Sequence, residues 1–478
     1  MTVSISSPTQ KTQQPMAYQS FWRDLKDAIR GKDRDYTVGG MNRAIVLLSV
    51  PMILEMVMES VFAVVDVYFV SRLGEEAIAV VGLTEAVMTL LFAVAIGLSM
   101  ATTAMVARRI GEKRPEAARV AAFQAIVLGL LLSLPFTAVG MLFPEKILHL
   151  MGATPEVASL GRYNVMIMMG GNLTIMLLFL INAIFRGAGN AAIAMWVLWL
   201  ANGINIVLDP CLIFGWGPFP ELGVAGAAVA TNIGRGIGVL FQIYLLFRSR
   251  SAISLRLAEL GIDMTVLKRL FRVSLTGMLQ WIIMTSSWIV LVRIVAVFGD
   301  DALAGYTLAI RIIIFTFLPA WGLSNATATL VGQNLGAGKP ERAERSVWLC
   351  GIYTALFMLS LAVVFLLFNE ELIMFFNSSP TVVAYGADCL RIISYVYLFS
   401  AFGMVMIQAF NGAGDTKTPT LVNFFAHWVL QIPLAYFLAI VLDMGPAGVF
   451  WAIVGGDFTM AVIAMALFKQ GRWKKQKI

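Results

Sequence analysis

The sequence predicts an all-α membrane protein with twelve transmembrane helices in two six-helix bundles. Of the 478 residues, 59% are hydrophobic and only 13% are charged, whereas soluble proteins carry about 25% charged residues. The mean hydropathy is +0.82, and apolar stretches of about 20 residues, enough to cross a bilayer, recur along the chain. The sequence also repeats itself, so the spans fall into two related halves.

The repeat has a spacing of 225 residues. Residues 97–119 (GLSMATTAMVARRIGEKRPEAAR) recur as residues 322–344 (GLSNATATLVGQNLGAGKPERAE). The motif FRGAG at 185–189 recurs as FNGAG at 410–414, and in the last helix of each half the spacing falls to 222. Two related halves in an apolar chain indicate a transporter in which one half rocks against the other.

The spans are expected to be helices, because a backbone in lipid must satisfy its own hydrogen bonds. An even number of spans in each half gives both halves the same orientation, so the repeat axis should lie along the membrane normal. The expected helices lie near 43–70, 77–105, 118–142, 160–184, 193–214, 223–247, 265–297, 302–330, 347–368, 383–408, 418–442 and 446–468.

The loops between these spans alternate in charge. The N-terminal tail, loops 106–119, 248–272 and 331–346, and the stretch 472–477 are basic, while the loops on the opposite side are acidic. The positive-inside rule therefore predicts a multi-pass protein of the inner cell membrane with both termini in the cytoplasm. The net charge of +7 then reflects topology and contact with anionic lipid, and no nucleic-acid partner is expected.

Five segments follow from this pattern. The expected order is a cytoplasmic tail (1–42) with a surface helix at 18–30, an N-terminal bundle (43–247), a cytoplasmic linker (248–264), a C-terminal bundle (265–468) and a basic cytoplasmic tail (469–478). The first 40 residues lack an apolar core, so we expect no cleavable signal peptide.

Ionisable residues within spans are costly and are therefore functional candidates. The first span carries Glu55, Glu59 and Asp66, whose spacings of 4 and 7 put them within about 40° of one another on a helix. Pro51 lies one turn before Glu55 and is placed to bend this helix. Glu55 and Glu59 are candidates for additional coupling groups or for groups that line a cavity.

The fifth span carries a second polar group. Asn205 and Asp209 are one turn apart and share a helix face, and Pro210 leaves the carbonyl of Ile206 without its helical donor. An amide, a carboxylate and a spare carbonyl are suited to hold a proton or a sodium ion. At the spacing of 225, the counterparts of Asp66, Asn205 and Asp209 are Leu291, Leu430 and Leu434, so the cluster is specific to the N-terminal half.

Other candidates are weaker. Gln280 and Trp281 are candidates for a substrate surface in the seventh span. The chain has only two histidines and three scattered cysteines, so neither a metal centre nor a cofactor is expected. No Ser/His/Asp set or metal-ligand spacing indicates an enzyme.

Several of these motifs occur together in one known family. PMILE at 51–55, VDVYFVSRLGEEAIA at 65–79, NIVLDP at 205–210, VGQNLGAGKPERAE at 331–344 and the paired FRGAG and FNGAG turns resemble the multidrug and toxic compound extrusion (MATE) transporters. The resemblance implies a V-shaped fold around a central cavity, a monomer, and efflux of a small organic, often cationic, compound in exchange for a cation.

The resemblance also bears on the coupling site. It is strongest to the DNA-damage-inducible branch, in which protons couple through the N-terminal bundle, and it implies that Asp66, Asn205, Asp209 and Thr231 are the coupling residues. Carboxylate and amide also suit Na⁺, so a sodium-coupled exporter using Asp66, Asn205 and Asp209 is an alternative. A lipid-linked oligosaccharide flippase of the same superfamily is another, although it would require a basic cavity.

Overall fold

A computed structural model describes residues 17–31, 35–248, 253–255, 261–476 and 478. Over this part of the chain, eleven helices are long and apolar enough to cross a membrane, and one bent pair of helices can supply a twelfth span. This agrees with the predicted fold class. The predicted tail and linker include residues outside the described ranges, so the domain boundaries stay predictions.

The N-terminal bundle contains six spans. They are α2 (Met41–Ser71), α3 (Glu75–Gly111), α4 (Pro115–Leu142), α6 (Pro155–Gly170) together with α7 (Asn172–Gly187), α8 (Ala191–Phe214) and α9 (Val224–Arg248), and the short helix α5 (Pro144–Leu150) precedes α6.

The C-terminal bundle follows the same order. Its spans are α10 (Met264–Val295) with the turn η2 (Ala296–Phe298), α11 (Asp300–Gly336), α12 (Pro340–Met374), α13 (Pro380–Ser394) together with α14 (Tyr397–Ala413), the segment Lys417–Val441, and α17 (Pro446–Lys469), which the turn η5 (Arg472–Lys475) follows.

Three predicted spans are interrupted. The fourth breaks at Gly171, where a side chain would collide with Asn232 of α9. The tenth bends by 61° between α13 and α14. The eleventh alternates α15 (Lys417–Asn423), π-helical η3 (Phe424–Gln431), α16 (Ile432–Tyr436) and π-helical η4 (Phe437–Val441). Pro433 lies where η3 gives way to α16, and proline supplies no amide hydrogen to a helix.

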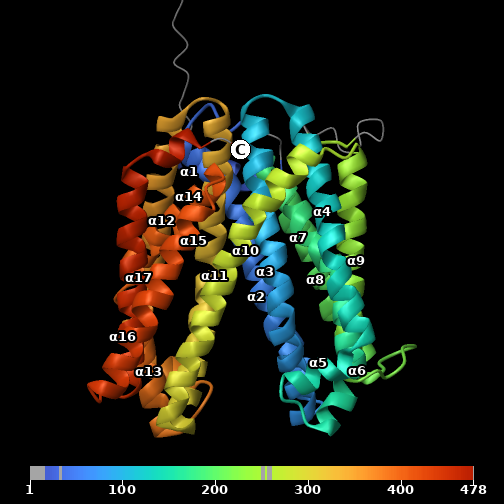
Figure 1. The fold of residues 1–478 in the computed structure, drawn as a ribbon, viewed down its shortest axis with the longest axis vertical. Helices are drawn as coiled ribbons and strands as arrows, with labels where there is room; N and C mark the ends of the chain where they lie inside the picture. Colours follow the sequence, from blue (N-terminus) through green and yellow to red (C-terminus); the bar gives the residue numbers. More distant parts are fainter. Residues whose placement is uncertain (1–16, 32–34, 249–252, 256–260, 477) are drawn as a thin grey trace, which may run out of the picture.

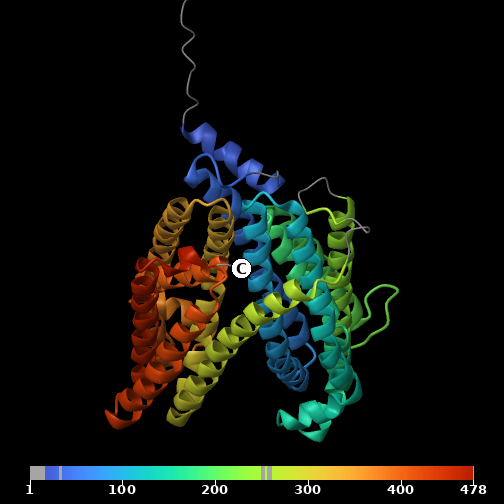
Figure 2. The ribbon, with the colours of Figure 1, turned by 45° about the horizontal axis from the view of Figure 1, so that its top comes forward.

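The two bundles meet at one end of the molecule and diverge toward the other (Figure 1). The predicted surface helix is present as α1 (Ala17–Arg30), which lies across the end where the bundles meet (Figure 2). It is attached there by Trp196 of α8, whose indole donates a hydrogen bond to the carbonyl of Ile29 at 2.8 Å. The last residues of the chain lie at this same end, which we call the terminus-bearing end.

The sequence repeat is also a repeat of contacts between the bundles. A side chain at Gly97 of α3 would collide with Met278 of α10, and one at Gly322 of α11 would collide with Ile53 of α2. Both partners in the second contact lie 225 positions from those in the first, so the interface has an approximate two-fold axis. A second such pair, nearer the terminus-bearing end, joins Gly111 to Gln333 and Gly336 to Arg108.

Candidate functional site

Asp209 is the most unusual polar group of the N-terminal bundle. It is fully buried on α8, and both of its carboxylate oxygens lack a hydrogen-bond partner within the described residues. Asp66 on α2 lies close enough to interact with it electrostatically. A buried carboxylate without donors is costly while it is ionised, so this arrangement can bind a proton or a small cation.

Asn205 and Thr231, the other two predicted coupling residues, contact each other. Asn205 on α8 donates a hydrogen bond to the hydroxyl of Thr231 on α9 at 3.0 Å. The carbonyl oxygen of Asn205 is buried and has no partner among the described groups. Asn205 and Thr231 therefore join α8 to α9 and leave one amide oxygen available one helical turn before Asp209.

Glu59 belongs to a separate, charged part of this site. Its carboxylate accepts a hydrogen bond from Asn202 of α8 at 3.1 Å. The guanidinium of Arg235 on α9 interacts electrostatically with both Glu59 and Asp66. Arg235 is absent from the residues predicted from the sequence, although its position in the middle of the sixth span is the same signal that identified the acids.

Glu55 has a different environment from the other two acids of α2. It is buried, and its Oε1 accepts hydrogen bonds from Arg186 at 3.3 Å and from Asn182 at 3.4 Å, both on α7. Of the three acids on α2, Glu55 is therefore held in an ion pair with Arg186, while it still interacts electrostatically with Glu59. Pro51 lies within an uninterrupted α-helix, so α2 continues through it in this conformation.

The C-terminal candidates are separate from this cluster. Gln280 on α10 is buried, with its Oε1 lacking a partner in the described structure. Trp281 packs against Trp321 of α11, with ring centroids 5.3 Å apart. Between the bundles, Glu85 of α3 interacts electrostatically with Arg311 of α11, and both of these side chains are exposed.

Asp388, the acid of the tenth span, is bound within its own helix. Its carboxylate accepts a hydrogen bond from Arg391 at 2.5 Å, and both side chains are about half exposed, at 44% and 52%. We therefore do not include it in a buried cation site.

The packing gives a more accurate correspondence between the fifth helices of the two bundles than the spacing of 225 does. Gly226 of α9 packs on Leu212 and Ile213, and its counterpart Gly448 of α17 packs on Leu438 and Ala439, which is a spacing of 226. Gly234 lies against Ala201 and Asn205, and its counterpart Gly456 lies against Gln431. The counterpart of Asn205 is therefore Gln431 rather than Leu430, and that of Asp209 is Ala435 rather than Leu434. A carboxylate at this position of the fifth helix therefore remains specific to the N-terminal bundle.

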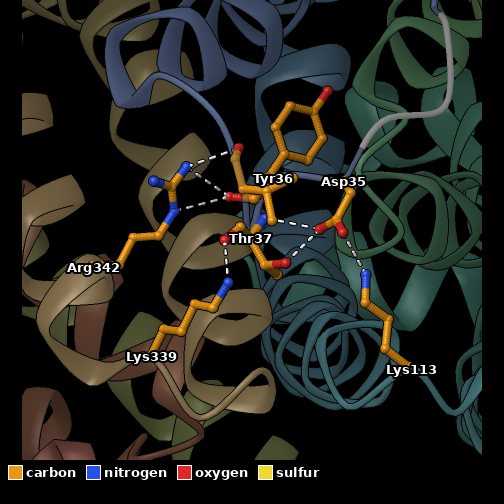
Figure 3. A network of polar contacts seen from close by, with 7 residues as sticks. Asp35, Tyr36, Thr37, Lys113, Lys339 and Arg342 are labelled. Carbon is orange, nitrogen blue, oxygen red and sulfur yellow. Dashed lines mark hydrogen bonds and ion pairs between the residues drawn. The ribbon is translucent and has the colours of Figure 1, made fainter.

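A segment near the N-terminus joins both bundles at the terminus-bearing end (Figure 3). We call residues 35–39 the N-terminal strap. Asp35 pairs with Lys113 of the N-terminal bundle at 2.6 Å, and the Tyr36 hydroxyl donates to the carbonyl of Gly189 at 3.1 Å. On the other side, Lys339 donates to the carbonyl of Thr37 at 2.9 Å.

Arg342 completes this connection to the C-terminal bundle. Its guanidinium donates to the backbone carbonyls of Tyr36, Val38 and Gly39, with distances of 2.9 to 3.4 Å. The C-terminal residues make a second crossing, in which Arg108 and Arg109 donate to the carbonyls of Gln476 and Ile478 at 3.1 and 2.9 Å. The terminus-bearing end is thus closed by contacts from both ends of the chain.

Comparison with known proteins identifies the family. The family model described as MatE matches residues 51–211 and again residues 277–437, which together make up more than half of the chain. The chain belongs to the MatE family. Each match covers the first five spans of one bundle in this MatE protein, and the second match begins 226 positions after the first.

Relatives of this MatE protein align over nearly their whole length. It is 27% identical to a probable multidrug resistance protein NorM of Thermotoga maritima, over 92% of this chain and 94% of the relative. It is 25% identical to an FAD transporter of Shewanella oneidensis, with coverages of 83% and 87%.

A solved structure shows the same fold. An outward-facing conformation of a multidrug resistance MATE family transporter is 28% identical, with a TM-score of 0.87 and coverages of 93% and 99%. The protein is therefore a multi-pass membrane transporter of the MATE family and not an enzyme.

Proposed function

We propose that this transporter exports small organic cations across the cytoplasmic membrane in exchange for protons, which bind in the N-terminal bundle. The observation that carries the proposal is the buried carboxylate of Asp209, which has no hydrogen-bond partner in the described structure and lies near Asp66. No acid occupies the equivalent place in the C-terminal bundle, where the counterpart is Ala435. A residue required only for helix packing would be expected in both bundles.

The arrangement of the bundles supports alternating access. The basic loops favour a cytoplasmic location for both termini, and the bundles are joined at that end and diverge at the other. This orientation corresponds to an outward-facing state, in which Asp66 and Asp209 would receive protons from outside. Glu59 and Glu85 add negative charge to the same bundle and favour a cationic substrate.

Protonation then drives release. Neutralising Asp66 and Asp209 removes the charge that attracts a cationic substrate and lowers the cost of packing α2 closer to α8. Rocking to the inward-facing state requires the N-terminal strap and the contacts of Arg108 and Arg109 with the C-terminal residues to separate. One charge that moves across ~100 mV supplies about 2.3 kcal/mol, which drives the cycle in one direction.

The test is export of a fluorescent organic cation in inverted membrane vesicles, with a proton or a sodium gradient imposed separately. We expect proton-driven transport in the wild type and its loss in Asp209→Asn. Asp388→Asn is the matched control, because that acid is half-exposed and bound by Arg391, and it should retain transport.

Two results would overturn the proposal. Full proton-driven export by Asp209→Asn would show that Asp209 is not the proton-coupling group. Transport driven only by sodium would instead support a sodium site, which the unpartnered Oδ1 of Asn205 beside the oxygens of Asp209 favours as the second candidate. If no cation is transported under either gradient, lipid-linked sugars are the next substrates to test.

A further inference from the structure

A second polar cluster lies inside the C-terminal bundle, on helices that the proposed coupling site does not use. Asn423, His427 and Gln431 follow one another at intervals of four residues, so they share one face of the α15 and η3 segment. The His427 Nδ1 is 2.6 Å from the Oε1 of Gln431. Asn423 is 1% exposed, and neither its Oδ1 nor its Nδ2 has a partner in the described structure.

An acid from the last span meets this stripe. Gln431 packs directly on Gly456 of α17, which places the next residue, Asp457, beside the stripe. The carboxylate of Asp457 accepts a hydrogen bond from Ser400 of α14 at 3.2 Å and interacts electrostatically with His427. Three spans of the C-terminal bundle thus converge on one His–Asp pair.

The backbone is distorted at the same place. Residues Phe424–Gln431 form π-helical turns, and such turns are rare and occur frequently at functional sites. The wider turn also shifts the alignment of this helix with α8, which is why Gln431 corresponds to Asn205.

The cluster occupies the position in the C-terminal bundle that the proposed coupling site occupies in the N-terminal one. Because Gly234 corresponds to Gly456, the adjacent Arg235 corresponds to Asp457. In the N-terminal bundle the acids are on α2 and α8 and the base is on α9. In the C-terminal bundle the base, His427, is on η3 and the acid, Asp457, is on α17. The fifth span thus carries the acid in one bundle and the base in the other, and the sixth span carries the reverse.

We propose that His427 and Asp457 form a second proton-binding site, with Gln431, Ser400 and Asn423 as its polar surroundings. Histidine is the side chain whose ordinary titration range lies closest to physiological pH. A second proton that enters and leaves here during the cycle would add to the driving force for export. This inference goes beyond the proposed function, since it assigns a site in the other bundle.

Few other titratable groups of the described residues face the His427–Asp457 pair. Tyr397 of α14 interacts electrostatically with Asp457, and Cys389 of α13 interacts with Tyr397. On α13, Asp388 and Arg391 pair with each other, and the Tyr436 side chain of α16 is exposed. The charged residues of α10, α15 and η5 lie near the helix ends or in the terminal turn, at Lys268, Arg269, Arg272, Arg293, Lys417, Arg472, Lys474 and Lys475.

The test uses the small number of histidines. The chain contains only two, His149 and His427, and His149 is exposed near the end of α5. When His149→Gln protein is labelled with ¹⁵N-histidine, His427 is the only histidine of this sequence that remains to give an imidazole signal. The full chain in lipid nanodiscs is titrated between about pH 5 and 9, the range around the ordinary histidine value.

We expect the His427 signal to titrate reversibly, and Asp457→Asn to move the midpoint to lower pH, because it removes a negative charge that favours the imidazolium. Asp388→Asn is the matched control and should leave the midpoint unchanged. A signal that does not titrate, or a midpoint that is the same in Asp457→Asn, would overturn the site whatever the transport assays show.

A second measurement tests the role in transport. The number of protons exchanged per substrate, obtained from the reversal potential in proteoliposomes, should be one lower in His427→Gln than in the wild type. Thermal unfolding of His427→Gln checks that the variant is folded. An unchanged proton number in a folded variant would overturn the involvement of this site in transport, independently of the result for Asp209→Asn.

Discussion

Arg186 donates a hydrogen bond to Oε1 of Glu55 at 3.3 Å, and this pair joins the FRGAG turn to the first membrane helix. At the spacing of 225, Gln280 takes the place of Glu55 and Asn411 that of Arg186. The C-terminal bundle therefore has two neutral amides where the N-terminal bundle has an ion pair. The exchange of both partners together indicates that the two charges depend on each other.

Replacing only one partner of this pair should destabilise the protein more than replacing both. We expect Arg186→Asn to lower the free energy of unfolding by about 3 kcal/mol or more, because it leaves a buried carboxylate unpaired. The double variant Glu55→Gln/Arg186→Asn should recover at least half of this loss. Thermal unfolding in detergent measures both, and a double variant less stable than Arg186→Asn alone would contradict the prediction.

The hydrogen bond between Asn205 and Thr231 should position the proposed coupling site. Thr231→Val removes the acceptor at 3.0 Å with little change in shape, at a cost of about 1 kcal/mol for a single hydrogen bond. We expect proton-driven export to fall about fivefold, which is the corresponding change in rate. Thr231→Ser keeps a hydroxyl and should transport like the wild type; equal losses in both variants would argue against this role.

The N-terminal strap should hold the terminus-bearing end closed. Arg342→Ala removes the donor to three strap carbonyls and should increase the population in which this end is open. Spin labels at Arg114 and Glu341, in a background without the native cysteines, report the distance between the bundles. Arg345→Ala, at an exposed position of the same helix α12, is the control, and an equal increase in that variant would count against a specific strap.

The strap should not act as a pH sensor. Burial raises the pKa of Asp35, but the Lys113 ammonium and the hydrogen bonds from Thr37 more than offset this and lower it to about 2, from the ordinary 3.8. Its stabilising contribution is therefore complete above pH 3.8 and is lost only as the pH falls through the folded value. Between about pH 5 and 8, Asp35→Asn should leave the shape of the transport profile unchanged. A changed profile would show that the strap titrates in this range.

The glycines at the interface should be required for close approach of the bundles. Gly97→Val places a side chain against Met278 of α10, and overpacking of this kind costs about 1–3 kcal/mol. We expect a longer distance between the spin labels and a lower unfolding temperature. Gly82→Val on the same helix α3 is the control, because nothing lies within 4 Å of the place that a Cβ would take there. Similar effects in both variants would show that close packing at the interface is not their cause.

Much of the proposed site follows from residue types alone. Asp66, Asn205 and Asp209 were identified because a charge or a paired amide inside a span is costly, and in the structure Asp66 interacts with Asp209 while Asn205 bonds to Thr231. Arg235 would have been identified in the same way. In contrast, the spacing of Glu55, Glu59 and Asp66 predicted only that the three acids lie on one side of the first span, and it is the position of Arg186 on another helix that gives Glu55 an ion-pair partner.

The membrane class, the spans and the two related halves were determined by the sequence itself, because bilayer thickness and backbone hydrogen bonding constrain each span locally. The tertiary structure decided which polar groups meet. Asn205 and Thr231 are 26 residues apart, and Asp35 reaches Lys113 across 78, and no local pattern encodes such contacts. The correspondence of Gln431 with Asn205 likewise depends on π-helical turns, which change the residues per turn without changing the apolar pattern of the sequence.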